Sequence, residues 1–148
     1  MSAAGRSPPA PAGLPLERLR ARAFRQTAVQ VPGCLPPNQP APHAGRFHRR
    51  GEPWPLYAAL DTETMWAEWS RATSGAVDRD GEERVVCTLD VDLRVLDLRV
   101  SATRAALGVT LDELIGPWSP AAPNRACLAV ATAARQAGAD GFVVPSAT

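Results

Sequence analysis

The chain of 148 residues contains no lysine, and all 16 of its basic residues are arginines. This absence excludes a catalytic lysine and the phosphate loop G-x-x-x-x-G-K-[ST] of many nucleotide-binding proteins. Histidine is scarce as well: His43 and His48 stand alone, and no H-E-x-x-H occurs, so a histidine-based metal site is hard to complete. The G-x-S-x-G turn of serine hydrolases is also missing. Most familiar enzyme classes are therefore excluded.

Long apolar runs and strong net charge are also lacking. No segment approaches the length of a membrane span, and the N-terminus has no apolar stretch typical of a signal peptide. The 16 basic and 15 acidic residues nearly cancel, to a net charge of +1. We therefore expect a cytoplasmic protein that binds neither membranes nor nucleic acid directly. The three cysteines, Cys34, Cys87 and Cys127, show no C-x-x-C spacing, and we expect them to be reduced and mostly buried.

The length fits one domain. Residues 1–15 are rich in proline and alanine and cannot bury enough surface to offset the cost of ordering, so we expect a disordered leader before a domain over 16–148. Residues 32–45 are again rich in proline and predict a long loop, of a kind that is often functional in small domains.

Apolar periodicity predicts a mixture of helices and strands. Residues 16–30 fit a short helix or a strand equally well. Strands are expected at 45–48, at 55–60 as a buried strand, in two short segments within 84–99, and at 142–144. Helices are expected at 61–73 with Asp61 or Thr62 as cap, in one or two pieces within 101–118 broken at Gly108 and Pro117, and at 125–137 with Asn124 as cap. Without a regular βαβ alternation, this order favours the α+β class.

Polar and aromatic residues are concentrated between positions 43 and 73. Glu68 would lie beside Trp69 at the border of an apolar helix face. On helix geometry alone, the simpler interpretation is a solvated glutamate or one paired with Arg71 or Arg25. Arg46, Arg49 and Arg50 form a cluster whose guanidinium forks suit a diphosphate; a solvated charge run is the alternative. Tyr57, the only tyrosine, is expected in the core with its hydroxyl hydrogen-bonded.

The order of these residues resembles a known family. The stretch G-R-F-x-x-x-G-x-x-x-x-L-Y-A-A-L-D-x-E-T-x-x-A-E at 45–68, followed by D-G-F-V-V-P-S at 140–146, is similar to the motif of the RES domain, named for an arginine, a glutamate and a serine. The resemblance covers roughly residues 20–148 and implies a fold like that of the ADP-ribosyltransferases. It implies that Arg46, Tyr57, Glu68 and Ser146 form one active site.

The resemblance also implies a function. Studied RES proteins are toxins that destroy NAD by breaking the bond between nicotinamide and ribose, by hydrolysis or phosphorolysis, and an Xre-type helix-turn-helix antitoxin restrains them. Glu68 would stabilise the positive charge that develops on the ribose, and Arg46 would grip a phosphate of NAD or inorganic phosphate. Ser146 would bind the ribose or position Glu68. NAD contacts are expected from Arg46, Tyr57, His48 and Arg49, with no metal and no cofactor beyond the substrates, in a homodimer within the toxin–antitoxin complex.

The chain departs from the family pattern at two places. Phe47 and His48 follow the arginine, where the family often has tryptophan and asparagine. The family usually continues into a further strand after the serine, so we expect this domain to lack a C-terminal strand. Two alternatives stay open: a transferase of the same fold that attaches ADP-ribose to protein, and a catalytically silent RES-like domain that only binds.

Overall fold

The computed structural model describes residues 13–29, 33–72 and 83–146. The elements follow in the order β1 (Glu17–Ala28), α1 (Thr62–Ala72), β2 (Arg84–Asp97), α2 (Ser101–Leu107), α3 (Leu111–Ile115), α4 (Arg125–Gln136) and β3 (Gly141–Val143). Strands and helices do not alternate regularly, which confirms the α+β class. The predicted leader lies almost wholly outside the described residues, as does most of the loop between α1 and β2.

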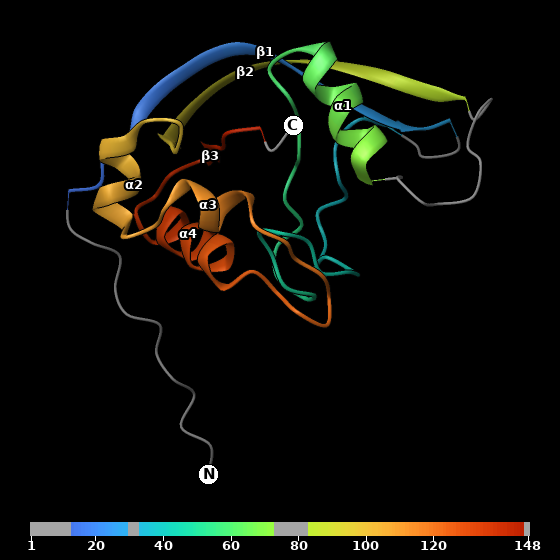
Figure 1. Cartoon of the computed structure of the whole chain (residues 1–148). Helices are drawn as coiled ribbons and strands as arrows, with labels where there is room; N and C mark the ends of the chain where they lie inside the picture. Colours follow the sequence, from blue (N-terminus) through green and yellow to red (C-terminus); the bar gives the residue numbers. More distant parts are fainter. Residues whose placement is uncertain (1–12, 30–32, 73–82, 147–148) are drawn as a thin grey trace.

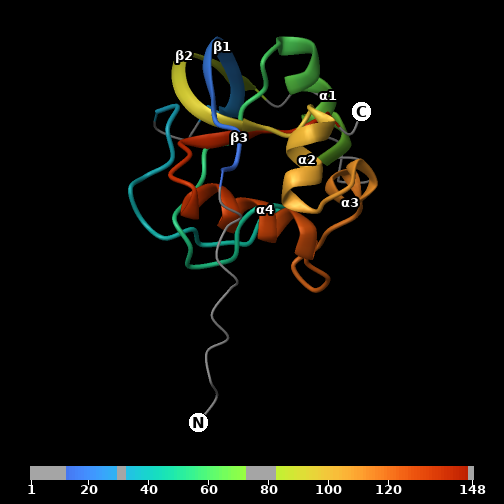
Figure 2. The same cartoon turned by 90° about the vertical axis from the view of Figure 1, so that its left-hand side faces the viewer.

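The sheet has the strand order β1-β2-β3. β1 pairs antiparallel with β2 along the whole length of β1, from Glu17 opposite Val95 to Ala28 opposite Arg84, whereas β3 adds a short parallel pairing at the end of β2. The two long strands form a curved ribbon that arches over α3 and α4 with α1 beside it (Figure 1), and the view turned by 90° shows β3 between this ribbon and α4 (Figure 2). Of the two alternatives predicted for residues 16–30, a helix or a strand, the strand is correct: it spans Glu17–Ala28. The two short strands expected within 84–99 form one continuous strand, Arg84–Asp97, because β1 pairs with residues 84–95 without a break.

The core lies where the end of β2 meets α4. Leu96, Leu98, Cys127 and Val130 are the largest side chains that are fully buried. Phe47 joins Leu98 and Val130 in the same cluster and contacts Phe142 of β3 edge to face, with ring centroids 5.0 Å apart. A fully buried leucine or phenylalanine contributes about 1.5–3 kcal/mol, so this cluster fixes the loop that carries Arg46 against α4 and β3.

Local capping explains the helix boundaries. Asp61 accepts a hydrogen bond from the Thr64 N–H at 2.6 Å at the start of α1. Asn124 accepts from the Cys127 N–H at 3.2 Å at the start of α4. Gly108 ends α2 in the left-handed conformation at φ 67°, which glycine adopts without strain. These caps confirm the helix starts and the break predicted from the sequence.

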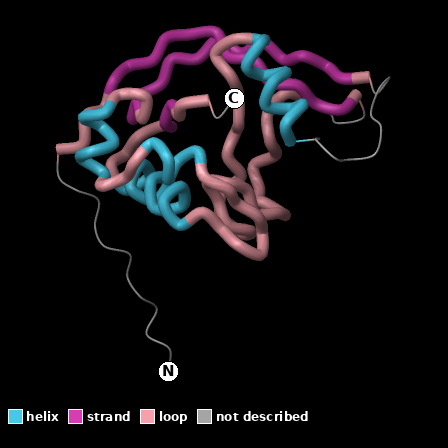
Figure 3. The backbone as a smooth tube through the Cα atoms, in the orientation of Figure 1, coloured by secondary structure: helices cyan, strands magenta, loops and turns pink. Residues whose placement is uncertain are grey.

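Two predicted strands are wrong. Residues 45–48 form a tight turn, in which the Gly45 N–H donates to the His48 carbonyl at 3.0 Å, rather than a strand. The expected buried strand at 55–60 touches β1 only where Ala59 pairs with Phe24, and Tyr57 is 45% exposed. Because Ala59 alone pairs with another strand, this segment remains a loop. Figure 3 shows the described part of 33–60 as loop beside the helices.

The expectation that all cysteines are reduced is also wrong. Cys34 and Cys87 form a disulfide with a Cα–Cα distance of 5.8 Å, whereas Cys127 is free and buried. Arg25, opposite Cys87 in the β1–β2 pairing, donates to the Cys34 carbonyl at 3.0 Å. The start of the proline-rich loop is therefore attached to both long strands.

None of the helices in the described ranges is long and apolar enough to cross a membrane.

Candidate functional site

Glu68 and Ser146 meet at one side of the fold. Glu68 lies in the second half of α1, and Ser146 follows β3. The Ser146 hydroxyl donates to Glu68 Oε1 at 3.1 Å, and Arg71 contacts Glu68 Oε2 at 2.9 Å. The Glu68 side chain is 40% exposed. A carboxylate with both oxygens held by donors, but still open to solvent, is oriented before any ligand binds.

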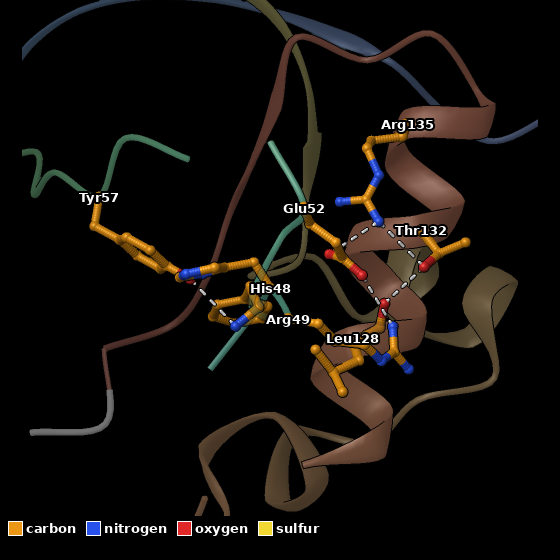
Figure 4. A network of polar contacts seen from close by, with 8 residues as sticks. His48, Arg49, Glu52, Tyr57, Leu128, Thr132 and Arg135 are labelled. Carbon is orange, nitrogen blue, oxygen red and sulfur yellow. Dashed lines mark hydrogen bonds and ion pairs between the residues drawn. The ribbon is translucent and has the colours of Figure 1, made fainter. Parts of the chain in front are cut away.

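Tyr57 and His48 form a second group. The Tyr57 oxygen lies 2.9 Å from His48 Nδ1 and accepts from the Phe47 N–H at 3.2 Å. His48 is buried, and its Nε2 lies 2.9 Å from the His43 carbonyl oxygen. Figure 4 shows Tyr57 and His48 pointing toward each other. Burial raises the pKa of Tyr57, and the Phe47 N–H and the charge of Arg46 offset part of that rise, so the phenol is neutral.

Arg46 is anchored at the end of α3. Its NH1 group donates to the carbonyl oxygens of Leu114, at 3.3 Å, and of Gly116. Carbonyls at the end of a helix lack partners within the helix, so the guanidinium satisfies groups that would otherwise be unpaired. Both carbonyl contacts use NH1, so Nε and NH2 are the groups of Arg46 that could bind an anion. Burial raises the pKa of the neighbouring Cys127 thiol, and Arg46 offsets part of this rise.

Arg49 belongs to a polar network that joins the loop carrying Arg46, Arg49 and Arg50 to α4. Arg49 contacts Glu52 Oε1 at 3.2 Å, and Arg135 contacts Glu52 Oε2 at 3.5 Å and the Thr132 hydroxyl at 3.4 Å (Figure 4). The two arginines are 60% and 45% exposed, so each pair contributes roughly 0–1 kcal/mol. The network fixes the direction of the loop more than it stabilises the fold.

The structure thus places the expected residues in separate contacts. Glu68 is hydrogen-bonded to Ser146, Tyr57 to His48, and Arg46 to the end of α3. Among the described residues, no hydrogen bond links the Glu68–Ser146 pair with the Tyr57–His48 pair. Nor do three or more potential metal ligands gather within the described ranges. The bridging role of Glu52 and Arg135 is not predictable from the sequence, because their contact spans the fold and no motif marks it.

Comparison with known proteins gives three results. The family model of the RES domain matches residues 15–148. The chain is 35% identical over 109 residues to a Mycobacterium tuberculosis protein named probable NAD(+) phosphorylase, an alignment that covers 73% of this chain and 50% of that protein. The chain therefore spans about half the length of this curated relative. The fold is similar to a chain in the crystal structure of the M. tuberculosis MbcT–MbcA toxin–antitoxin complex, with a TM-score of 0.71 and 24% identity, covering 89% of this chain and 72% of that one.

Proposed function

The chain belongs to the RES domain family, and on that basis we propose that it is an enzyme that degrades NAD by breaking the bond between nicotinamide and ribose. The observation that carries the proposal is the hydrogen bond from Ser146 to Glu68, which joins two residues of the family motif across 78 positions of sequence. The name of the related NAD(+) phosphorylase supports NAD as the substrate.

The geometry suits departure of nicotinamide as a neutral leaving group. When the C–N bond breaks, its electron pair goes to the positively charged pyridinium ring, and positive charge develops on the ribose. The Glu68 carboxylate, held by Ser146 and Arg71, is an oriented negative charge that stabilises this transition state. An oxygen of inorganic phosphate then forms the new bond to the ribose carbon, which gives ADP-ribose 1-phosphate and nicotinamide. The relative's name favours phosphate over water as the acceptor.

Three other residues, Arg46, Tyr57 and Arg49, would bind the substrates. The two donor groups of Arg46 that α3 leaves unused suit a phosphate of NAD or the inorganic phosphate. The half-exposed ring of Tyr57 offers a face for nicotinamide. Arg49 would add positive charge nearby. NAD and phosphate are substrates here, and the proposed reaction needs no further cofactor.

We propose further that the enzyme is a bacterial toxin of the cytoplasm, where NAD is available, and that an antitoxin of the Xre helix-turn-helix type restrains it. The similarity of fold to a chain of a toxin–antitoxin complex supports a protein partner. A homodimer within that complex is part of the proposal. In the cellular test, expression of this chain alone should stop growth, and co-expression with its helix-turn-helix antitoxin should restore it.

The direct test is release of nicotinamide from NAD by the purified protein, with and without inorganic phosphate. Glu68→Gln removes the charge at nearly constant shape and should lower the rate roughly 100- to 1000-fold. Glu63→Gln is the matched control: it makes the same change in the exposed first turn of the same helix and should leave the rate within about twofold.

The outcomes separate the candidates. Release that needs phosphate identifies phosphorolysis, and release without phosphate identifies hydrolysis. Transfer of the ADP-ribose label to protein would replace the proposal by protein ADP-ribosylation. Folded wild-type protein that binds NAD but releases no nicotinamide would refute the proposal in favour of a silent binding domain.

A further inference from the structure

We propose that His48 is a positioning residue that holds the hydroxyl of Tyr57 in one hydrogen-bonding orientation, and that it does so through Nδ1. This inference rests on the proposed function, because Tyr57 is one of the residues that would contact NAD. It assigns His48 to the support of Tyr57 instead of direct contact with the substrate.

The hydrogen bonds of His48 determine which ring nitrogen carries the proton. Nε2 lies 2.9 Å from the carbonyl oxygen of His43, which can only accept, so Nε2 is the donor. In a neutral imidazole the other nitrogen, Nδ1, is then an acceptor. The partner of Nδ1, at 2.9 Å, is the Tyr57 oxygen, and in this tautomer the Tyr57 hydroxyl donates to His48.

The Tyr57 oxygen is consequently held from two sides. Its proton goes to His48, and one of its lone pairs accepts from the Phe47 N–H at 3.2 Å. One acceptor position remains, which suits a ribose hydroxyl or the amide of nicotinamide. Because the oxygen is fixed while the residue is 45% exposed, the direction of the whole ring is fixed as well.

The turn at 45–48 packs directly against the imidazole of His48. A Cβ atom at Gly45 would lie 2.3 Å from Cε1 and 2.6 Å from Nδ1 of His48, and 3.1 Å from the Tyr57 oxygen. His48 itself is only 7% exposed. The glycine of the motif is needed here because its backbone packs directly against the ring that holds Tyr57.

Two substitutions separate the two nitrogens of His48. In His48→Asn the amide oxygen takes the place of Nδ1 and still accepts from Tyr57, while the contact with His43 is lost. In His48→Gln the amide nitrogen takes the place of Nε2 and still donates to His43, while the acceptor for Tyr57 is lost. We expect His48→Asn to release nicotinamide at least tenfold faster than His48→Gln.

The same pair of substitutions in a Tyr57→Phe background tests whether the effect acts through the hydroxyl. There the tenfold difference should shrink to less than about twofold, because no hydroxyl is left to position. Equal rates for the two variants in the presence of Tyr57, or a difference that persists in Tyr57→Phe, would overturn the proposal. Thermal unfolding of each variant checks that the comparison is made between folded proteins.

A second measurement does not depend on NAD. Tyr57 is the only tyrosine, so the absorbance of phenolate reports on this residue alone. Donation of its proton to an acceptor stabilises the neutral phenol, so the pKa of Tyr57 should be higher in His48→Asn than in His48→Gln. If wild type releases no nicotinamide but this order holds, the proposed function fails and the positioning role stands. The reverse order, or equal pKa values, would refute the positioning role.

Discussion

The disulfide between Cys34 and Cys87 should contribute a large part of the stability of the domain. It closes a loop across a sequence separation of 53 residues, which contains the arginine cluster, Tyr57 and α1. In the chain-entropy description, closing a loop of that length lowers the entropy of the unfolded chain by about 14 cal/mol/K, or about 4 kcal/mol at 25 °C. Since unfolded chains keep some residual structure, the expected loss on breaking the bond is about 2–4 kcal/mol.

The perturbation with the fewest side effects is Cys34→Ser. Cys34 is only half-buried, so a hydroxyl there finds water, whereas Cys87 is buried and would leave a hydroxyl or a cavity in the protein. Urea denaturation should give a free energy of unfolding about 2–4 kcal/mol below that of the oxidised wild type, and the melting temperature should fall by roughly 5–15 °C. The loop should also become more accessible to proteases, since one of its attachments to β2 is gone.

Reductant provides the control. Reduced wild type and Cys34→Ser should have the same stability within about 0.5 kcal/mol, and reductant should not change the variant. A wild-type melting temperature that does not respond to reductant, with both thiols shown to be free by alkylation, would refute the argument that loop closure stabilises this fold. The same alkylation on protein quenched directly from cells determines which form exists there, because the cytoplasm keeps most thiols reduced.

Three further substitutions test how the fold is held. Asp97→Asn removes a carboxylate whose pKa is lowered from its ordinary value of 3.8 by its hydrogen bonds to Arg99. The stability that this pair contributes is present above pH 3.8 and is lost as the pH falls through the lowered pKa, so the cost of the substitution in urea denaturation, about 1 kcal/mol at about pH 7, should shrink toward about pH 3. A cost that does not change with pH would contradict the pairing. Asn124→Ala removes the cap of α4 and the donor to the Glu113 carbonyl, and should lower stability by about 1–2 kcal/mol; no loss would show that water replaces both bonds. Leu98→Ala leaves a cavity in the core and should cost about 2–5 kcal/mol by the same assay; a cost below about 1 kcal/mol would mean that the core collapses around it.

The sequence correctly predicted the features that depend only on residues close along the chain, such as helix caps. Asp61 and Asn124 cap the helices for which they were predicted, because a helix start is determined by side chains within four residues of it. Gly108 breaks the segment 101–118 as expected. The α+β class followed from the order of such segments, and it was correct.

Predictions that depended on distant partners were less reliable. The alternation over 84–99 predicts two short strands, but β1 pairs without a break with residues 84–95 and makes them one. The segment 55–60 has strand-like residues, yet only Ala59 finds a partner on β1. A strand is stable only where another strand pairs with it, and that partner is not visible in the local sequence.

The sequence by itself determined the helix ends, the α+β class and, through the order of the motif, the four residues to examine: Arg46, Tyr57, Glu68 and Ser146. Only the tertiary structure brought the Ser146 hydroxyl to Glu68, joined Cys34 to Cys87, and closed the turn at Gly45 on the ring of His48. The physical reason is the separation along the chain of the residues that interact. Capping and turn preferences act over a few residues, whereas these contacts between distant segments exist only after the long β1–β2 ribbon, α4 and the loop have packed together.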